Sequence, residues 1–266
     1  MTADIAAGSA QFEIGRVIRR MFYVIRKNLV SFALLSLIFL LPGFIFVFWS
    51  LLAAYLHIPI RTWLPSDYAT AALVNSIGGF VISFVFQRLL EASVAHGVMA
   101  SMKGSKSSFA ECLVTGLKNA LPLAAIALIG LVAIIVGLAV LIVPGIVLAL
   151  MFSVAAPVRV MEHTGIAETL NRSTQLTHGH RAQIFALLVI YYVITLAIGF
   201  SVRPLAGLPY LGTSGTRNSV LVFMILSGVV RTFLGLLLAG GVASIYYELR
   251  LVKEGYEPEQ LAAVFA

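Results

Sequence analysis

Long stretches without charged residues constrain this chain more than any other feature of its sequence. A transmembrane helix needs about 20 predominantly apolar residues, at a rise of 1.5 Å per residue. Only 11% of the residues are charged and 60% are hydrophobic, which excludes an ordinary soluble enzyme. Five stretches contain at most one charge each: residues 28–60, 68–87, 119–158, 182–202 and 218–247. We therefore predict an all-α, polytopic helical membrane protein.

The stretch 119–158 is too long for one crossing, because a helix of that length would measure about 60 Å, twice the hydrocarbon thickness. We expect the chain to turn back at Pro144-Gly145, where the backbone loses a donor and gains conformational freedom. The whole chain, 1–266, is then a single integral membrane domain with six transmembrane helices at about 29–56, 69–90, 120–143, 146–161, 182–202 and 218–247.

Each pair of predicted crossings follows a short amphipathic segment. Apolar residues recur every three or four positions from Ile14 to Ile25, and Arg16 and Arg20 fall on the opposite face. Such a helix places its apolar side at the acyl boundary and its basic side toward anionic headgroups. We therefore expect three hairpins, each preceded by a cytoplasmic interfacial helix at about 12–28, 108–119 and 166–181. Similar tripeptides, Lys27-Asn28-Leu29 and Lys118-Asn119-Ala120, support a repeat weakly.

The distribution of Lys and Arg predicts the orientation. With the N-terminus inside, fourteen of the 18 Lys and Arg residues lie on the cytoplasmic side, among them Arg88, Lys103 and Lys106. Three lie outside (Arg61, Arg203, Arg217) and one, Arg231, lies within the membrane. The opposite orientation would invert this ratio, against the positive-inside rule. We expect a multi-pass protein of the bacterial inner membrane with both termini in the cytoplasm.

Small residues form a stripe along two of the predicted crossings. They recur every three or four positions and let helix backbones approach closely: Ala127, Gly130, Ala133 and Gly137 in one crossing, and Gly228, Thr232, Gly235 and Ala239 in the last. Arg231 borders the second stripe. Two interpretations of this intramembrane charge are open. It snorkels from about one turn deep to the outer headgroups, which is the simpler account, or it contacts an anion or lipid phosphate.

Signals for catalysis and cofactors are absent from the sequence. There is no HExxH, Walker A, GxGxxG or GxSxG motif, and His178-x-His180 alone is a poor metal site. One cysteine, Cys112, excludes an intramolecular disulfide. We therefore expect no catalytic, cofactor-binding or metal residues, no cofactor and no nucleic-acid partner.

Two segments carry a resemblance to a known family. The first contains Pro157-Val158-Arg159-Val160-Met161-Glu162 and Arg172-Ser173-Thr174-Gln175-Leu176-Thr177, and the second is Tyr246-Tyr247-Glu248-Leu249-Arg250-Leu251-Val252-Lys253-Glu254-Gly255. Their order resembles the membrane domain associated with some bacterial glycerophosphodiester phosphodiesterases, over roughly residues 100–258. The catalytic barrel of that family needs about 250 residues, and only 20 follow Tyr246. The resemblance therefore implies the membrane part without the catalyst.

The same segments supply a polar cluster at the cytoplasmic interface. In one interpretation, Glu162, Arg172, Arg250 and Glu254 form an ion-pair latch. In the other, Arg172, Ser173, His180 and Arg181 surround Gly179 as a phosphate cradle. We favour the latch, because the opposite charges are present to pair.

The predicted function is that of a non-enzymatic membrane protein that organises or handles lipid, or acts as a scaffold. The alternative is a transporter of small solutes or lipids with discontinuous helices at Pro42 and Pro144. A polar cavity within the membrane would favour transport and a solidly packed bundle would favour a scaffold. We expect membrane lipids with anionic headgroups as partners; protein partners and a homo-oligomer stay open.

Overall fold

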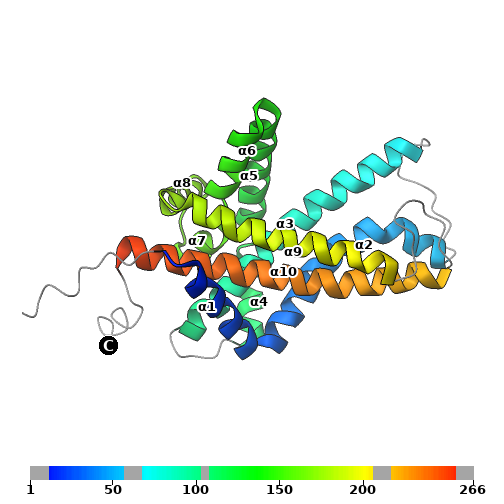
Figure 1. Cartoon of the computed structure of the whole chain (residues 1–266), viewed down its shortest axis with the longest axis horizontal. Coiled ribbons are helices and arrows are strands. Elements are labelled where there is room, and N and C mark those ends of the chain that lie inside the picture. Colours follow the sequence, from blue (N-terminus) through cyan, green and yellow to red (C-terminus); the bar gives the residue numbers. More distant parts are fainter. Residues whose placement is uncertain (1–11, 57–67, 103–107, 206–216, 256–266) are drawn as a thin grey trace, which may run out of the picture.

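The described part of the chain is helical throughout (Figure 1). The structure is a computed structural model that describes residues 12–56, 68–102, 108–205 and 217–255. Arg61, Lys103 and Lys106, used above for the orientation, lie outside these ranges. The helices are α1 (Ile14–Lys27), α2 (Leu29–Leu56), α3 (Tyr68–Met102), α4 (Phe109–Lys118), α5 (Ala120–Val140), α6 (Ile142–Met151), α7 (Ala155–Glu162), α8 (Ile166–Thr177), α9 (Arg181–Leu205) and α10 (Arg217–Glu254).

Six described segments are long and apolar enough to cross a membrane, which confirms the predicted multi-pass helical class. They are Leu29–Phe46, Ser76–Ser101, Ala120–Val140, Ile142–Glu162, Arg181–Val202 and Ile225–Glu254. Two helices continue well past the ends predicted from charge. α3 extends from the predicted 90 to Met102, and α10 from 247 to Glu254. In both cases charged residues lie within the continuous helix, because each has a partner: Arg88 pairs with Glu91 of the same helix, and Glu248 of α10 pairs with α1.

The turn between α5 and α6 lies at Leu141, three residues before the predicted Pro144-Gly145. Leu141 is extended (φ −159°, ψ 149°), and Pro144 is the third residue of α6. A proline is tolerated there because the first N–H groups of a helix have no intrahelical acceptor. Gly145 serves packing instead: a Cβ atom at this position would lie 2.7 Å from the backbone nitrogen of Leu138. The chain therefore turns between α5 and α6 as predicted, but at Leu141 and not at Pro144-Gly145.

The fourth candidate crossing consists of two helices rather than one. α6 ends at Met151, and a turn over residues 152–154 separates it from α7. Ser153 supports this turn by donating from Oγ to the carbonyl of Leu150 at 2.8 Å. Figure 1 shows that the α5–α6 pair extends away from the axis shared by α9 and α10.

Pro42 lies inside α2, which continues without interruption to Leu56. A proline within a helix removes one hydrogen bond and bends the helix without requiring a break. Gly43 brings α2 close to α3, since a Cβ atom there would lie 3.0 Å from Cα of Ser83. Neither Pro42 nor Pro144 therefore marks the unwound segment on which the discontinuous-helix alternative depends.

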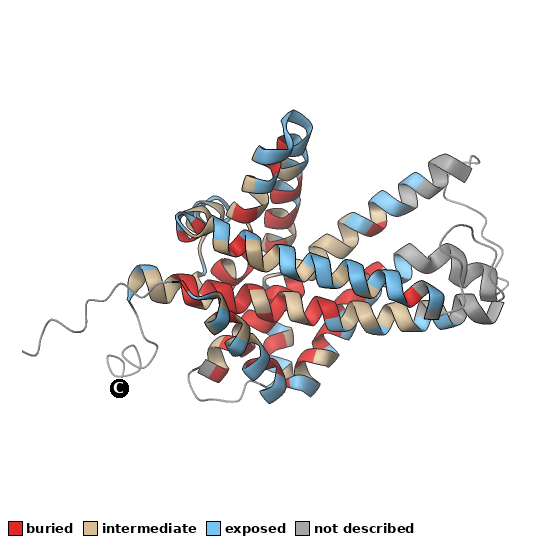
Figure 2. Cartoon of the chain, viewed as in Figure 1, coloured by how far each residue is buried: buried red, intermediate tan, exposed pale blue. Residues whose placement is uncertain are grey.

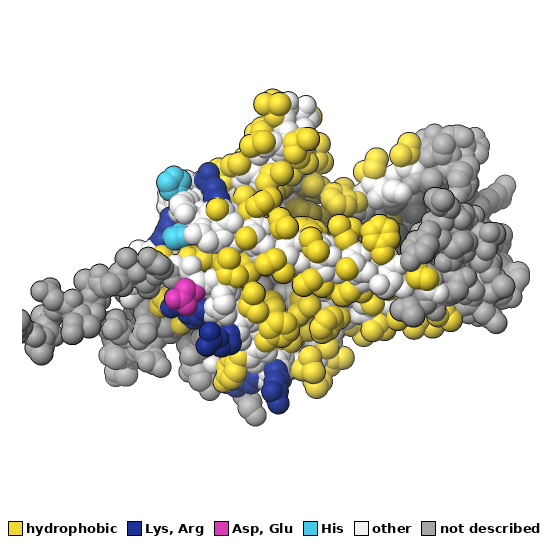
Figure 3. All heavy atoms as spheres, viewed as in Figure 1, with side chains coloured by type: hydrophobic (Ala, Val, Ile, Leu, Met, Phe, Trp, Pro, Cys, Tyr) yellow, Lys and Arg dark blue, Asp and Glu magenta, His cyan; other side chains and the backbone are white. Residues whose placement is uncertain are grey.

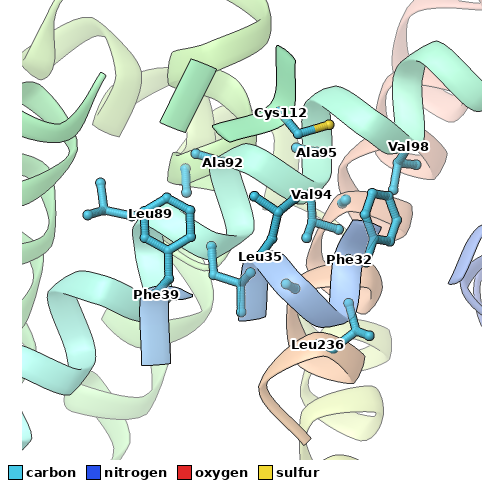
Figure 4. Packing of buried hydrophobic residues seen from close by; sticks show 14 of the residues in the cluster. Phe32, Leu35, Phe39, Leu89, Ala92, Val94, Ala95, Val98, Cys112 and Leu236 are labelled. Carbon is cyan, nitrogen blue, oxygen red and sulfur yellow. The ribbon is translucent and has the colours of Figure 1, made fainter. Parts of the chain in front are cut away.

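α10 lies at the centre of the packing and contributes to two buried clusters (Figure 2). In the larger one, aromatic and aliphatic side chains of α2 pack against α3, α4 and α10 (Figure 4), including Phe32, Leu35, Phe39, Leu89, Val98, Cys112 and Leu236. The small residues of α10 meet α2: Cβ atoms at Gly228 and Gly235 would lie 3.3 Å from Phe44 and 2.2 Å from Leu40. This is the close approach that the stripe predicts.

Asn28 and Asn119 join a short helix to a long one in the same way. Each ends a short helix (α1, α4), and each donates from its side-chain amide to a carbonyl four residues earlier, at 3.2 Å and 2.9 Å. The similar tripeptides noted in the sequence therefore adopt similar local structures.

Candidate functional site

Charged side chains gather at one end of the bundle, where α1, α8 and the last turns of α10 meet (Figure 3). We call this the charged end. On the face shown, apolar side chains cover α9, α10 and the α5–α6 pair. Two ion-pair groups lie at the charged end, and a cavity with two arginines lies farther along the bundle.

The first group joins the two segments that carry the family resemblance. Arg172 of α8 donates from Nε to Glu162 Oε2 at 2.8 Å and also pairs with Glu254 of α10. Arg250 pairs with Glu254 at 2.8 Å. Tyr246 extends the network by donating from its hydroxyl to Glu162 Oε1 at 3.0 Å. The network ties α7 and α8 to α10, and all four residues of the latch interpretation belong to it.

Tyr246 was missed by the sequence analysis. It is fully buried and contacts both Glu162 and Arg250. Its spacing of four residues before Arg250 on one helix was the available signal, but the sequence analysis named this tyrosine only as the first residue of the second resembling segment.

Two of the remaining residues of the cradle interpretation, Ser173 and His180, make other contacts. Ser173 is buried and donates to the carbonyl of Met151 at 2.6 Å. His180 stacks on Phe12, with ring centroids 5.6 Å apart. Partial burial, and secondarily the charge of Lys253, lower the pKa of His180, so a neutral imidazole adds no positive charge for a phosphate. Arg172 itself is occupied by two carboxylates. The arrangement is that of a latch.

The second ion-pair group docks α1 on α10. Glu248 is fully buried; its Oε1 lies 3.0 Å from Arg16 Nε and its Oε2 lies 2.8 Å from Arg20 Nη1. The guanidinium of Arg20 also lies over the ring of Tyr247, 4.3 Å from its centroid. Two cations around one buried carboxylate position α1 firmly, because an unpaired charge there would be costly.

The sequence analysis expected the apolar face of α1 to lie against acyl chains. In the structure, part of this face packs on other helices of the protein. Val17, Val24 and Ile25 are buried. Ile25 contacts α10 closely, since a Cβ atom at Gly240 would lie 2.9 Å from its side chain. The sequence showed an apolar face but not what would cover it.

A partly open cavity of about 590 Å³ lies between α2, α3, α9 and α10. Apolar side chains supply most of its wall. The polar residues that line it are Ser83, Gln87, Arg88, Tyr191, Tyr192, Thr195, Ser227 and Arg231. Among the described residues that line this cavity there is no Asp or Glu, so its polar part is cationic.

Arg88 of α3 and Arg231 of α10 both line this cavity. The sequence analysis assigned Arg88 to the cytoplasmic end of its crossing; α3 instead continues beyond it, and Arg88 lines the cavity. Its Nη1 lies 2.7 Å from Oε2 of the fully buried Glu91. No carboxylate among the described residues pairs with Arg231. A smaller cavity of about 150 Å³, toward α5 and α6, shares Arg88 as a wall residue.

Hydrogen bonds between helices frame the cavity. Gln87 donates to the carbonyl of Gly235 at 3.2 Å, and Tyr191 donates to that of Leu234 at 3.3 Å. Both acceptors belong to α10, next to its contact with α2. These bonds hold α3 and α9 in fixed positions on either side of the cavity.

Comparisons with known proteins add no relative: no family model, no curated protein and no solved structure matches this chain. Within the described ranges, no three His, Cys, Asp or Glu side chains gather as a metal ion would require. What the cavity and the two ion-pair groups can bind therefore follows from the charge, polarity and geometry of their side chains.

Proposed function

We propose that this protein handles phospholipid within a bacterial inner membrane and catalyses no reaction. The observation that carries the proposal is the cavity between α2, α3, α9 and α10, with an apolar wall and a cationic polar part. A phospholipid combines these two characters in one molecule. A solidly packed bundle would have favoured a scaffold.

The orientation we propose has both termini in the cytoplasm, which places the charged end at the cytoplasmic surface. The excess of Lys and Arg in the segments between crossings supports it. α1, α4 and α8 would then lie at the cytoplasmic interface, with the exposed Arg19 and Arg26 of α1 near anionic headgroups.

Reporter fusions test this orientation. Fusions at residues 5, 105, 170 and 266 are expected to report a cytoplasmic position, and fusions at Pro65 and Gly212 an external one. A fusion at 170 that reports the outer side would contradict the proposed path of α5 to α7.

The two segments that resemble the membrane domain of bacterial glycerophosphodiester phosphodiesterases support membership in that group of membrane proteins. In this chain those segments contribute the network around Arg172 and Glu254. The proposal therefore assigns these motifs to holding α7, α8 and α10 together, and assigns lipid contact to the cavity.

Filling the cavity tests the proposed function. Gly199 lines it, and a Cβ atom there meets no atom within 4 Å. We expect Gly199→Phe to fold normally but to retain at least several-fold less phospholipid after purification in mild detergent, measured as lipid phosphorus per protein. Gly15→Phe is the matched control, because Gly15 has the same open space but lies on α1, away from the cavity. Equal retention by wild type and Gly199→Phe would overturn the proposal.

A further inference from the structure

We infer that the cavity binds the phosphodiester headgroup of an anionic phospholipid, with Arg231 as its principal contact and Arg88 as its second. This inference rests on the proposed function and names the ligand of the same cavity. The acyl chains of the lipid would lie along the apolar wall.

Unsatisfied polar atoms converge on this cavity. Three buried side-chain atoms that lack a hydrogen-bond partner belong to residues that line it: Ser83 Oγ, Arg88 Nε and Arg231 Nε. Buried polar groups are almost always hydrogen-bonded, because an unmade bond costs most of the desolvation of the group. The two arginine Nε–H groups can only donate, and the Ser83 hydroxyl can also donate, so an acceptor would satisfy all three.

The charges around the cavity require that acceptor to be an anion. Glu91 is paired with Arg88, which leaves the positive charge of Arg231 without a carboxylate among the described residues. A charged side chain inside a membrane-spanning segment is costly unless it is paired. A headgroup phosphate carries one negative charge and offers several acceptor oxygens, which suits the planar fork of an arginine.

Arg231 lies 17 residues from Glu248 along α10, about 25 Å, so its depth alone would allow it to snorkel to the opposite headgroups. Its Nε is nevertheless buried without a hydrogen-bond partner, which a side chain that reaches the headgroups would not show. Tyr192 and Arg88 line both the larger and the smaller cavity. A small anion would fill only the polar part of 590 Å³, whereas a phospholipid also covers the apolar wall.

The test is thermal stability of the full chain in detergent, titrated with phosphatidylglycerol, phosphatidylcholine or glycerol 3-phosphate. We expect phosphatidylglycerol to raise the Tm of the wild type and the other two to have little effect. Arg231→Gln should weaken the phosphatidylglycerol effect by roughly tenfold to a hundredfold in apparent Kd, and Arg231→Lys by less. Without lipid, Arg231→Gln should melt no lower than the wild type, because it removes an unpaired charge.

Arg19→Gln is the matched control, since Arg19 is exposed on α1, and its titration should resemble that of the wild type. An equal effect of phosphatidylglycerol on wild type and Arg231→Gln would overturn the inference, and the proposed function would stand if the wild type still retained lipid. If glycerol 3-phosphate raised the Tm of the wild type as much as phosphatidylglycerol does, the ligand would be a free phosphate ester and not a lipid. If phosphatidylcholine raised the Tm of the wild type as much as phosphatidylglycerol does, the site would not require a lipid with a net negative charge. A wild type that retains no phospholipid would contradict the proposed function itself.

Discussion

The double variant Arg16→Gln/Arg20→Gln is expected to lose about 3–5 kcal/mol of stability, because it leaves the buried carboxylate of Glu248 without either of its cations. Glu248 is fully buried, so water cannot replace the lost partners. The measurement is the unfolding transition in detergent. The same variant should also loosen α1, since these pairs join that helix to α10.

Arg19→Gln/Arg26→Gln is the matched control, because it removes the same charge from exposed positions of the same helix. We expect this control to change stability by less than about 0.5 kcal/mol. Adding Glu248→Gln to the first variant should recover much of the loss, since the stranded charge is then gone. If both double variants melted at the same temperature, the buried pairs would contribute nothing beyond surface charge.

The second large effect is expected at Arg172. Arg172→Gln leaves Glu162 without a cation, whereas Glu254 keeps Arg250. It should cost about 1–3 kcal/mol, below the value for a fully buried pair because the side chain of Arg172 is 29% exposed. Glu162→Gln should cost less, since Arg172 keeps Glu254. The double variant Glu162→Gln/Arg172→Gln should recover part of the loss, with a coupling of about 0.5–3 kcal/mol.

Arg26→Gln is the control for this cycle, because Arg26 is exposed on α1 and belongs to neither the latch nor the cradle interpretation. The cycle also separates the latch from the cradle. A phosphate cradle would make Arg172→Gln lose the stabilisation by anionic lipid and Glu162→Gln gain it. Equal lipid effects in both variants, together with a measurable coupling, are the result expected for the latch.

Local patterns in the sequence predicted the single helices with few errors. The apolar face of residues 14–27 and the capping residues Ser108 and Glu111 are local features, and both helices form where they were expected. The capping box is complete: Glu111 N–H donates to Ser108 Oγ and Ser108 N–H donates to Glu111 Oε2, each at 3.1 Å. Errors arose where charged residues were taken to end a helix, as at Arg88. That residue pairs with Glu91 in the same helix, and α3 continues past both to Met102.

The sequence by itself determined the class of this protein, since uncharged stretches of helical length leave few structures other than a multi-pass helical bundle. It also placed four latch residues near one another, because their segments follow crossings that end on the same side. Only the tertiary structure decided that Arg88 and Arg231, 143 positions apart, face one cavity. It alone also decided that Glu248 lies between two arginines of α1. The physical reason is that such contacts depend on the rotation and close approach of helices, which small residues such as Gly235 and Gly240 permit but do not specify.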